Sequence, residues 1–269
     1  MRAHGRRVGA GTPRADGVYV DARGGTITSI IDEASDVPDN AVTISPAALQ
    51  AMSANVKLHA RRYMRINDAI TLTRDGQSLT ALVDFFEPGE PSGSLADLNR
   101  IDIAADITTN RGDVTIKAPH IANVGTPTIT TGGGAITLDT TGLEGPGATI
   151  DASGLNLNAG TGAVTATTAQ SFIRLGEVAG GSFMARAFSF ITTGDIATAG
   201  GPVDLQSAES SVNPGMIMSG GGAVLLDAPE SSINANSGID SGGGNITATA
   251  RFNVSASSIM SGGGAVSLT

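Results

Sequence analysis

The chain contains no cysteine and no tryptophan, and aromatic residues make up only 3% of its 269 residues. The lack of cysteine excludes disulfides and cysteine-based metal sites. Globular domains of this size normally use several large rings to fill their cores. The scarcity of aromatics therefore favours a thin core built from smaller aliphatic side chains. Apolar runs stay shorter than the roughly 18 residues of a membrane-spanning helix, so we expect no membrane span.

Lysine is also scarce, since Lys57 and Lys117 are the only two, and the formal net charge is −9. Such an acidic surface repels nucleic-acid phosphates and anionic lipids, so we expect no nucleic-acid partner. The exception is the start of the chain, residues 1–17, which holds Arg2, Arg6, Arg7 and Arg14. Without aromatics or a helical pattern, this segment is predicted to be a disordered basic tail, with a nucleic-acid-binding arm as the alternative.

A short sequence motif, called the phrase below, recurs throughout the chain. It consists of an apolar residue, then small polar residues with glycines, and a second apolar residue seven positions after the first. The last three copies read IMSGGGAV, IDSGGGNI and IMSGGGAV. The second apolar residue advances from Val203 to Val224, Ile246 and Val266, by 21, 22 and 20 residues. A fixed period of this size indicates a solenoid. The copies begin at Val20, Ile107, Ile129, Ile196, Ile217, Ile239 and Ile259.

Two further apolar rows keep a constant phase with Val224, Ile246 and Val266. They consist of Val212, Ile233 and Val254, and of Ile217, Ile239 and Ile259. Three rows require three parallel sheets around one core, because alternate residues of a strand face the same side. The predicted fold is therefore all-β: a right-handed parallel β-helix with a triangular cross-section and coils of about 20–22 residues.

The β-helix is predicted to cover residues 18–269, and the chain length divided by the period gives about 12 coils. Ser45 and Pro46 are suited to the start of a short helix near residues 45–52. Residues 87–98 are rich in proline, glycine and serine and are predicted to be a loop insertion. At the corners, glycine allows a positive φ, so a β-branched residue at Gly243 should destabilise more than a change at Thr247.

The sequence motifs of the repeats are similar to those of a known class of proteins. Residues 44–82, then IDIAADITTNRGDVTIKA at residues 101–118, resemble the repeats of filamentous haemagglutinin-type exoproteins. The typical phrase of that family is a strand, D-I-x-[VI], a turn, A-I-T-T, G-G and D/N-[VI]-T-[IL]. It is found here at residues 101–116 and 129–138, and the resemblance covers most of residues 18–269.

These exoproteins are large bacterial adhesins secreted by the two-partner route. The resemblance implies that the chain is secreted or lies at the bacterial cell surface, with an outer-membrane transporter as its secretion partner. It also implies a structural and adhesive role, as a rigid stalk or display surface in adhesion, aggregation or biofilm, with a ligand on a host or neighbouring cell. No cofactor follows from it, and we expect no enzymatic activity.

Arg111, Gly112 and Asp113 are the candidate binding residues, because an RGD triplet on an exposed turn is an integrin-binding signal. The triplet falls where other coils carry the glycine corner, which favours exposure. A structural interpretation is also open. The corner already favours glycine followed by aspartate, so a single change from glycine to arginine would create the triplet.

The leading alternative function is a polysaccharide-active β-helix enzyme, a lyase or hydrolase. Such an enzyme needs carboxylates that converge with a basic partner. Asp102, Asp106 and Asp113 form the densest acidic cluster, and Lys117 is the only nearby lysine. We interpret these three as solvated turn carboxylates, so no catalytic residue is assigned.

Other chemistries have weaker support in the sequence. His4, His59 and His120 lie far apart and do not suggest a zinc site, and the calcium-binding nonapeptide is missing, so no metal is predicted. Ice binding would need Thr-x-Thr pairs in the same phase from coil to coil. Thr128-Ile129-Thr130 and Thr247-Ala248-Thr249 are such pairs, but Leu225-Leu226-Asp227 interrupts the pattern.

Overall fold

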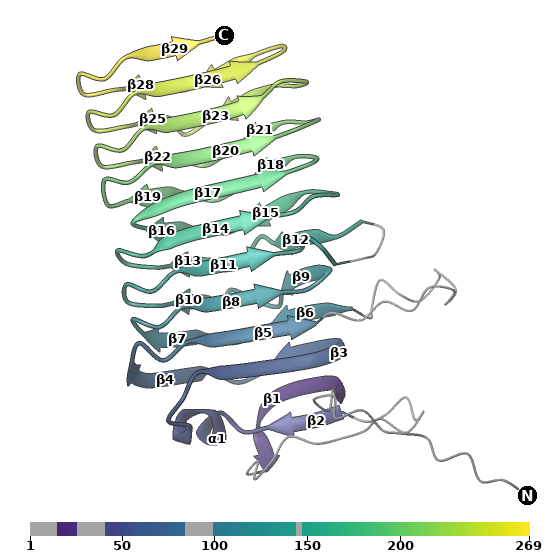
Figure 1. Cartoon of the computed structure of the whole chain (residues 1–269). Coiled ribbons are helices and arrows are strands. Elements are labelled where there is room, and N and C mark those ends of the chain that lie inside the picture. Colours follow the sequence, from purple (N-terminus) through teal and green to yellow (C-terminus); the bar gives the residue numbers. More distant parts are fainter. Residues whose placement is uncertain (1–14, 26–40, 84–98, 144–146) are drawn as a thin grey trace, which may run out of the picture.

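The structure is a computed structural model that describes residues 15–25, 41–83, 99–143 and 147–269 (Figure 1). These residues form a right-handed parallel β-helix of about nine turns, so the predicted fold is confirmed. Each coil contributes one strand to each of three parallel sheets. Residues 1–14, which hold most of the predicted tail, and the predicted insertion at residues 87–98 lie outside the described residues.

Every strand pairs in parallel with its counterparts in the neighbouring coils. The first sheet consists of β3 (Val56–Ile66), β5 (Leu79–Val83), β8 (Val114–Lys117), β11 (Ile136–Asp139), β14 (Ala163–Thr167), β17 (Ser182–Ala187), β20 (Val203–Ser207), β23 (Val224–Ala228), β26 (Ile246–Ala250) and β29 (Val266–Leu268). The second consists of β2 (Ala41–Ile44), β1 (Ala15–Gly25), the end of β3, β6 (Arg100–Ile103), β9 (His120–Asn123), β12 (Thr149–Ala152), β15 (Ile173–Leu175), β18 (Ile191–Thr192), β21 (Val212–Asn213), β24 (Ile233–Ala235) and β27 (Val254–Ala256).

The third sheet has nine strands and closes the triangle. It consists of β4 (Ile70–Asp75), β7 (Ile107–Asn110), β10 (Thr128–Thr130), β13 (Asn156–Asn158), β16 (Val178–Gly180), β19 (Ile196–Thr198), β22 (Ile217–Met218), β25 (Ile239–Asp240) and β28 (Ile259–Met260). The predicted number of 12 coils is therefore too high for the described residues. The N-terminal region departs from the regular coil of three separate strands. There, β3 alone spans two sheets, and helix α1 precedes it.

The three predicted apolar rows are confirmed as register partners. Val224 pairs with Ile246 and Ile246 with Val266 in the first sheet. The same holds for the rows of Val212 in the second sheet and Ile217 in the third. The row members in the coils before the last two are buried and form one continuous core. Stacked Val, Ile, Leu and Ala side chains fill most of this narrow interior, and Phe183 is the one aromatic ring in the buried core of the described residues.

Glycine stacks on glycine at the corner between the third and first sheets. A Cβ atom on Gly222 would lie 2.0 Å from the carbonyl oxygen of Gly201, and one on Gly244 would lie 2.1 Å from that of Gly222. Neighbouring coils therefore approach too closely here for any side chain. The glycine before each of these, such as Gly243 with φ +128°, faces open space but has a backbone conformation that L-residues rarely adopt.

A row of hydroxyl groups lies beside this glycine column. The Ser219 hydroxyl lies 2.5 Å from the carbonyl oxygen of Gly222 and 3.0 Å from that of Ser241. Ser241 repeats the arrangement with Gly244 at 2.5 Å and Ser261 at 3.2 Å. Each hydroxyl therefore lies within reach of two carbonyl oxygens, one in its own corner and one in the next coil, and its single O–H can donate to either. This explains why Ser or Thr precedes the glycines in most copies of the phrase.

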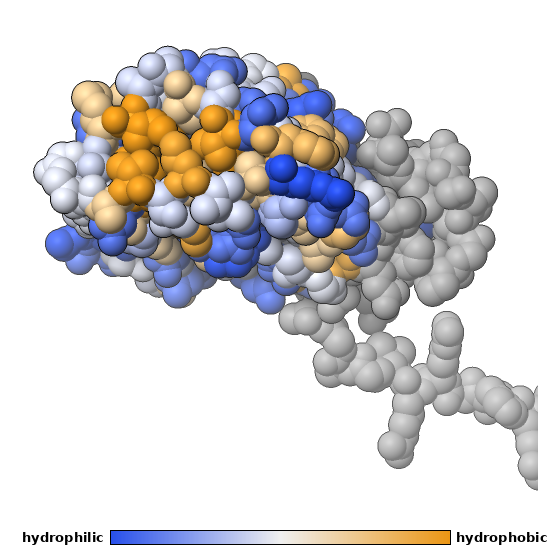
Figure 2. All heavy atoms as spheres, turned by 90° about the horizontal axis from the view of Figure 1, so that it is seen from above, coloured by the Kyte–Doolittle hydropathy of each residue, from blue (hydrophilic) through white to orange (hydrophobic). Residues whose placement is uncertain are grey.

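The two ends of the described β-helix differ. Helix α1 (Pro46–Ala51), with Ser45 as its N-cap, lies at the N-terminal end and buries Leu49. At the other end Val266 and Leu268 are each 47% exposed, and Figure 2 shows apolar residues gathered on that end. Among the described residues, no helix has the length and apolar character needed to cross a membrane.

Candidate functional site

The RGD triplet lies at the corner between β7 and β8. The Arg111 side chain is 70% exposed, its backbone has φ +65°, and its guanidinium lies 3.7 Å from the Asp75 carboxylate. Gly112 is buried, and a Cβ atom there would lie 1.9 Å from the carbonyl oxygen of Gln77. The exposed Asp113 carboxylate accepts a hydrogen bond of 2.8 Å from the Ala135 backbone N–H in the next coil.

Gly112 and Asp113 therefore both have structural roles in this coil. Gly112 begins the glycine column, and Asp113 joins two coils as Asp195 does further along, where its carboxylate accepts a 2.8 Å hydrogen bond from Met216 N–H. Both charged side chains of the triplet are exposed, as the sequence predicts for a binding turn. Integrin binding stays a prediction.

The acidic cluster of the sequence is divided among elements with separate partners. Asp106 accepts a hydrogen bond of 2.8 Å from Thr128 N–H, and Lys117 pairs with Asp139 at 2.7 Å. The prediction that Asp102 is a solvated turn carboxylate is wrong. It lies on β6, is only 1% exposed, and accepts hydrogen bonds from both Tyr63 and Arg100.

The outer side of the second sheet, where Asp102 lies, was not predicted as a functional site from the sequence. Along this side, successive coils place arginine, aromatic and histidine side chains next to one another in register. We call it the arginine–aromatic face. It consists of Tyr63, Arg65, Arg100, Asp102, His120, Ala122, Thr149, Asp151, Phe172, Arg174, Phe190 and Thr192.

A polar cluster forms the N-terminal half of this face. The Tyr63 hydroxyl donates to Asp102 Oδ2 at 2.7 Å, and Arg100 donates to the same oxygen at 2.8 Å. The Arg100 guanidinium also lies 5.8 Å from the centre of the Tyr63 ring. Burial, and then the hydrogen bond to Asp102, raise the pKa of Tyr63. Burial alone would lower the pKa of Arg100, but its hydrogen bond to Asp102 and the carboxylate charge raise it.

His120 follows Arg100 in the same row, on the next strand. Its Nδ1 lies 3.1 Å from the Thr149 hydroxyl, which is one strand further along. Burial, and secondarily the positive charge of Arg100, lower the pKa of His120. The imidazole is therefore neutral near pH 7, with one ring nitrogen as a hydrogen-bond donor and the other as an acceptor.

An aromatic stack with an arginine forms the C-terminal half. The Phe172 and Phe190 rings are stacked with centroids 4.7 Å apart and an interplanar angle of 5°. The Arg174 guanidinium lies 4.7 Å from the centre of one ring and 5.0 Å from the other. It also approaches Asp151 to 3.4 Å on the preceding strand. Guanidinium groups over aromatic rings are attracted to the negative ring faces.

Charge distinguishes this face from the chain as a whole. Arg65, Arg100 and Arg174 against Asp102 and Asp151 give a formal charge of 3 − 2 = +1, whereas the chain carries −9. Neither histidine in the described residues belongs to a metal-binding group, because no cluster of three or more suitable ligands occurs among those residues. His4 lies outside them. The chemistry that this face offers is therefore recognition by guanidinium and aromatic groups.

Threonines form a single column on the first sheet. Thr80, Thr115, Thr137 and Thr165 are register partners on successive strands. The neighbouring outward column reads Leu82, Lys117, Asp139 and Thr167, so paired Thr-x-Thr columns do not form there.

No protein-family model matches this sequence, and searches of curated proteins and of solved structures give no match to it. What is established is the class: a repeat protein with a parallel β-helical fold.

Proposed function

We propose that this chain is a structural and adhesive segment of a large secreted bacterial surface protein, acting as a rigid stalk and display surface. The observation that supports this most is the continuous core, which runs through the stacked coils from Ile44 to Ala248. Opening the stack between two coils would break hydrogen bonds in all three sheets at once, so the coils resist separation. About nine coils spaced roughly 4.8 Å apart give a body about 40 Å long.

The likeness of the repeats to filamentous haemagglutinin-type exoproteins adds the cellular setting to this proposal. Under it, the chain is exported by an outer-membrane partner transporter and is presented outside the cell. Its role there is adhesion, aggregation or biofilm formation, and its outward side chains provide the contacts. The RGD corner is one candidate contact, since Arg111 and Asp113 are exposed.

A bead assay tests the adhesive role. The purified chain is coupled to polystyrene beads, and clustering of the beads with Gram-negative bacteria or epithelial cells is scored by microscopy. Beads that carry a Gly222→Val variant at equal density are the control, because valine cannot fit against Gly201 and the stack should fail to form. We expect clustering with the wild-type chain alone. Wild-type beads that behave like bare beads would refute the adhesive role.

The second candidate, a polysaccharide lyase or hydrolase, is favoured by the cluster of Asp102, Arg100 and Tyr63, which joins a carboxylate to a basic partner. General acid–base catalysis requires that the carboxylate reach the substrate. Asp102 is 1% exposed and both groups bind the same oxygen, so the display role has better support. Release of reducing ends from polygalacturonate, lost in Asp102→Asn, would instead support the enzyme.

A further inference from the structure

The arginine–aromatic face combines two kinds of contact in one straight row. Tyr63, Arg100 and His120 are register partners on successive strands, so a new side chain is presented about every 4.8 Å along the axis. The row then continues to the Phe172–Phe190 stack. A linear polymer lying parallel to the axis would meet these groups in turn. A compact ligand would meet only one or two of them.

The Phe172–Phe190 stack is flanked by small residues. Thr149 precedes the stack in the row, and Ser211 occupies the equivalent position in the coil after Phe190. Both rings are partly exposed, and the small neighbours leave room beside them. A flat apolar ligand surface can therefore contact the stack without displacing a large side chain.

Arg174 supplies a charged contact at the same place. Its side chain is 43% exposed, and its exposed partner Asp151 lies 3.4 Å away. Exposed ion pairs of this kind are weak, so a ligand carboxylate can compete for the guanidinium. The planar guanidinium binds carboxylates through two parallel hydrogen bonds, and its position over the rings holds it in place.

We propose that the arginine–aromatic face binds a linear carboxylated polysaccharide. Arg174 receives a sugar carboxylate, and the Phe172–Phe190 stack contacts the apolar face of a sugar ring. This ligand class combines negative charge, a flat apolar face and a repeat along its length, which are the three features that the face complements. The inference rests on the proposed display function, since it names a ligand class for one side of the displayed surface.

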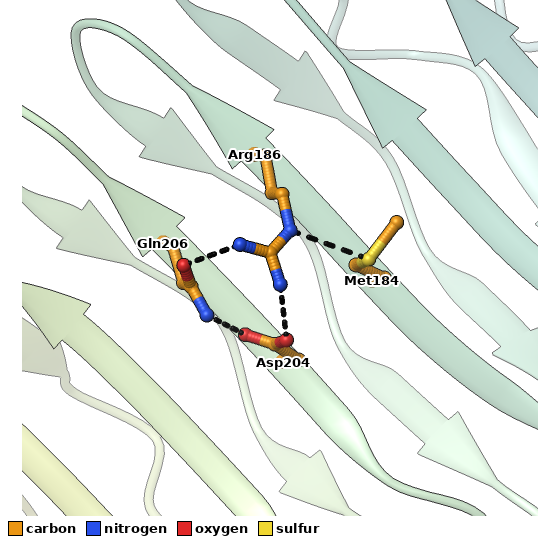
Figure 3. Close-up of polar contacts among 4 residues, drawn as sticks. All are labelled: Met184, Arg186, Asp204 and Gln206. Atoms are coloured by element: carbon orange, nitrogen blue, oxygen red, sulfur yellow. Dashed lines mark hydrogen bonds and ion pairs between the residues drawn. The ribbon is translucent and has the colours of Figure 1, made fainter.

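The structure offers a matched control for Arg174 on a different sheet. Arg186 on β17 is 45% exposed and pairs with Asp204 at 2.9 Å. Figure 3 shows this pair with its neighbours Gln206 and Met184. Arg186 also donates to Gln206 at 2.5 Å and lies 3.4 Å from Met184 Sδ, but no aromatic ring belongs to this group. Arg174 and Arg186 are thus similar in exposure and pairing, and they differ in their aromatic surroundings.

The experiment is isothermal titration of the full chain with polygalacturonate, with its methyl ester, and with poly-L-glutamate. We expect binding of polygalacturonate, little binding of the uncharged ester, and weaker binding of poly-L-glutamate, which has carboxylates but no sugar ring. Arg174→Gln should weaken the binding of polygalacturonate about tenfold, which is about 1.4 kcal/mol. Arg186→Gln should leave it within about twofold of the wild type.

A second variant tests the aromatic contact without endangering the fold. Phe190→Ser introduces the residue that the next coil already carries at Ser211. We expect this variant to keep the circular dichroism spectrum of the wild type and to bind polygalacturonate severalfold more weakly.

Three results would overturn the inference. These are no binding of polygalacturonate by the wild type, equal losses in Arg174→Gln and Arg186→Gln, or poly-L-glutamate bound as tightly as the polysaccharide. The last would assign the face to an acidic peptide. The bead assay can succeed while this titration fails, which would leave the display role standing with a different ligand.

Discussion

Ile246 and Val266 are register partners on neighbouring strands, yet Ile246 is fully buried and Val266 is 47% exposed. Both belong to the same apolar row and occur in the same kind of coil. The difference is that β26 has a coil on each side, whereas β29 is paired on one side only among the described strands. Burial in this fold is therefore supplied by the neighbouring coil, as in other solenoids.

This dependence predicts unequal effects of the same truncation. Ile246→Ala should destabilise the chain by about 2–5 kcal/mol, because it leaves a cavity between two coils. Val266→Ala should cost less than about 1 kcal/mol, because the side chain is half exposed. Urea unfolding followed by circular dichroism compares the two midpoints. Equal shifts would contradict the view that neighbouring coils bury the row.

The geometry of the glycine corner predicts unequal losses of stability at adjacent positions. Gly244→Ala should destabilise by about 3 kcal/mol or more, because its Cβ would lie 2.1 Å from the Gly222 carbonyl oxygen. Gly243→Ala should cost only about 1–2 kcal/mol, from its positive φ alone. Thr247→Ala, on the outward side, is the control with little expected change. Thermal melting of the three variants measures the order, and a larger effect at Gly243 than at Gly244 would contradict it.

The hydroxyl row predicts a smaller but specific effect. Ser241→Ala should cost about 1–2 kcal/mol, because the carbonyl oxygens of Gly244 and Ser261 lose the one hydroxyl donor that they share. The exposed Ser267 provides the control, and Ser267→Ala should be nearly neutral. Denaturant midpoints of the two variants give the comparison. If both variants matched the wild type, the hydroxyl row would not contribute to stability.

The lowered pKa of His120 leads us to expect a loss of folding stability in mild acid. Its pKa is lowered in the folded chain by burial and by Arg100, so below about pH 6.5 the unfolded chain binds a proton that the folded chain does not. Stability from this group is therefore complete above pH 6.5 and falls as the pH decreases towards the lowered value. Unfolding at pH 7.5 and pH 5.5 should show a smaller difference in His120→Gln than in the wild type. The same difference in both would contradict this role.

The sequence predicts the C-terminal coils well, because Val224, Ile246 and Val266 keep a nearly constant period and each row must face the core. The N-terminal region follows the period less closely. There β3 runs from the first sheet into the second, and its register with β5 and β6 depends on where the chain bends. Apolar spacing does not determine that bend.

The arginine–aromatic face could not be predicted in the same way. Tyr63, Arg100, His120 and Thr149 are neighbours in one row, but they are separated by 37, 20 and 29 residues along the chain. The uneven spacing arises because extra residues lie between β5 and β6 and between β11 and β12. The RGD triplet is visible in the sequence because its residues are consecutive, whereas the residues of this face come together only through coil register.

Coil register is thus the central claim, and the lack of native cysteine allows it to be tested directly by cross-linking. Thr137 and Thr165 are partners on β11 and β14, although they are 28 residues apart. At roughly 4.8 Å between strands, cysteines at these two positions lie within disulfide reach. A Thr137→Cys, Thr167→Cys pair is offset by two residues, roughly 8 Å away, and lies beyond it. The account predicts an efficient cross-link in the first pair and little in the second under mild oxidation, read by mass spectrometry. No cross-link in the first pair, or equal yields in both, would contradict it.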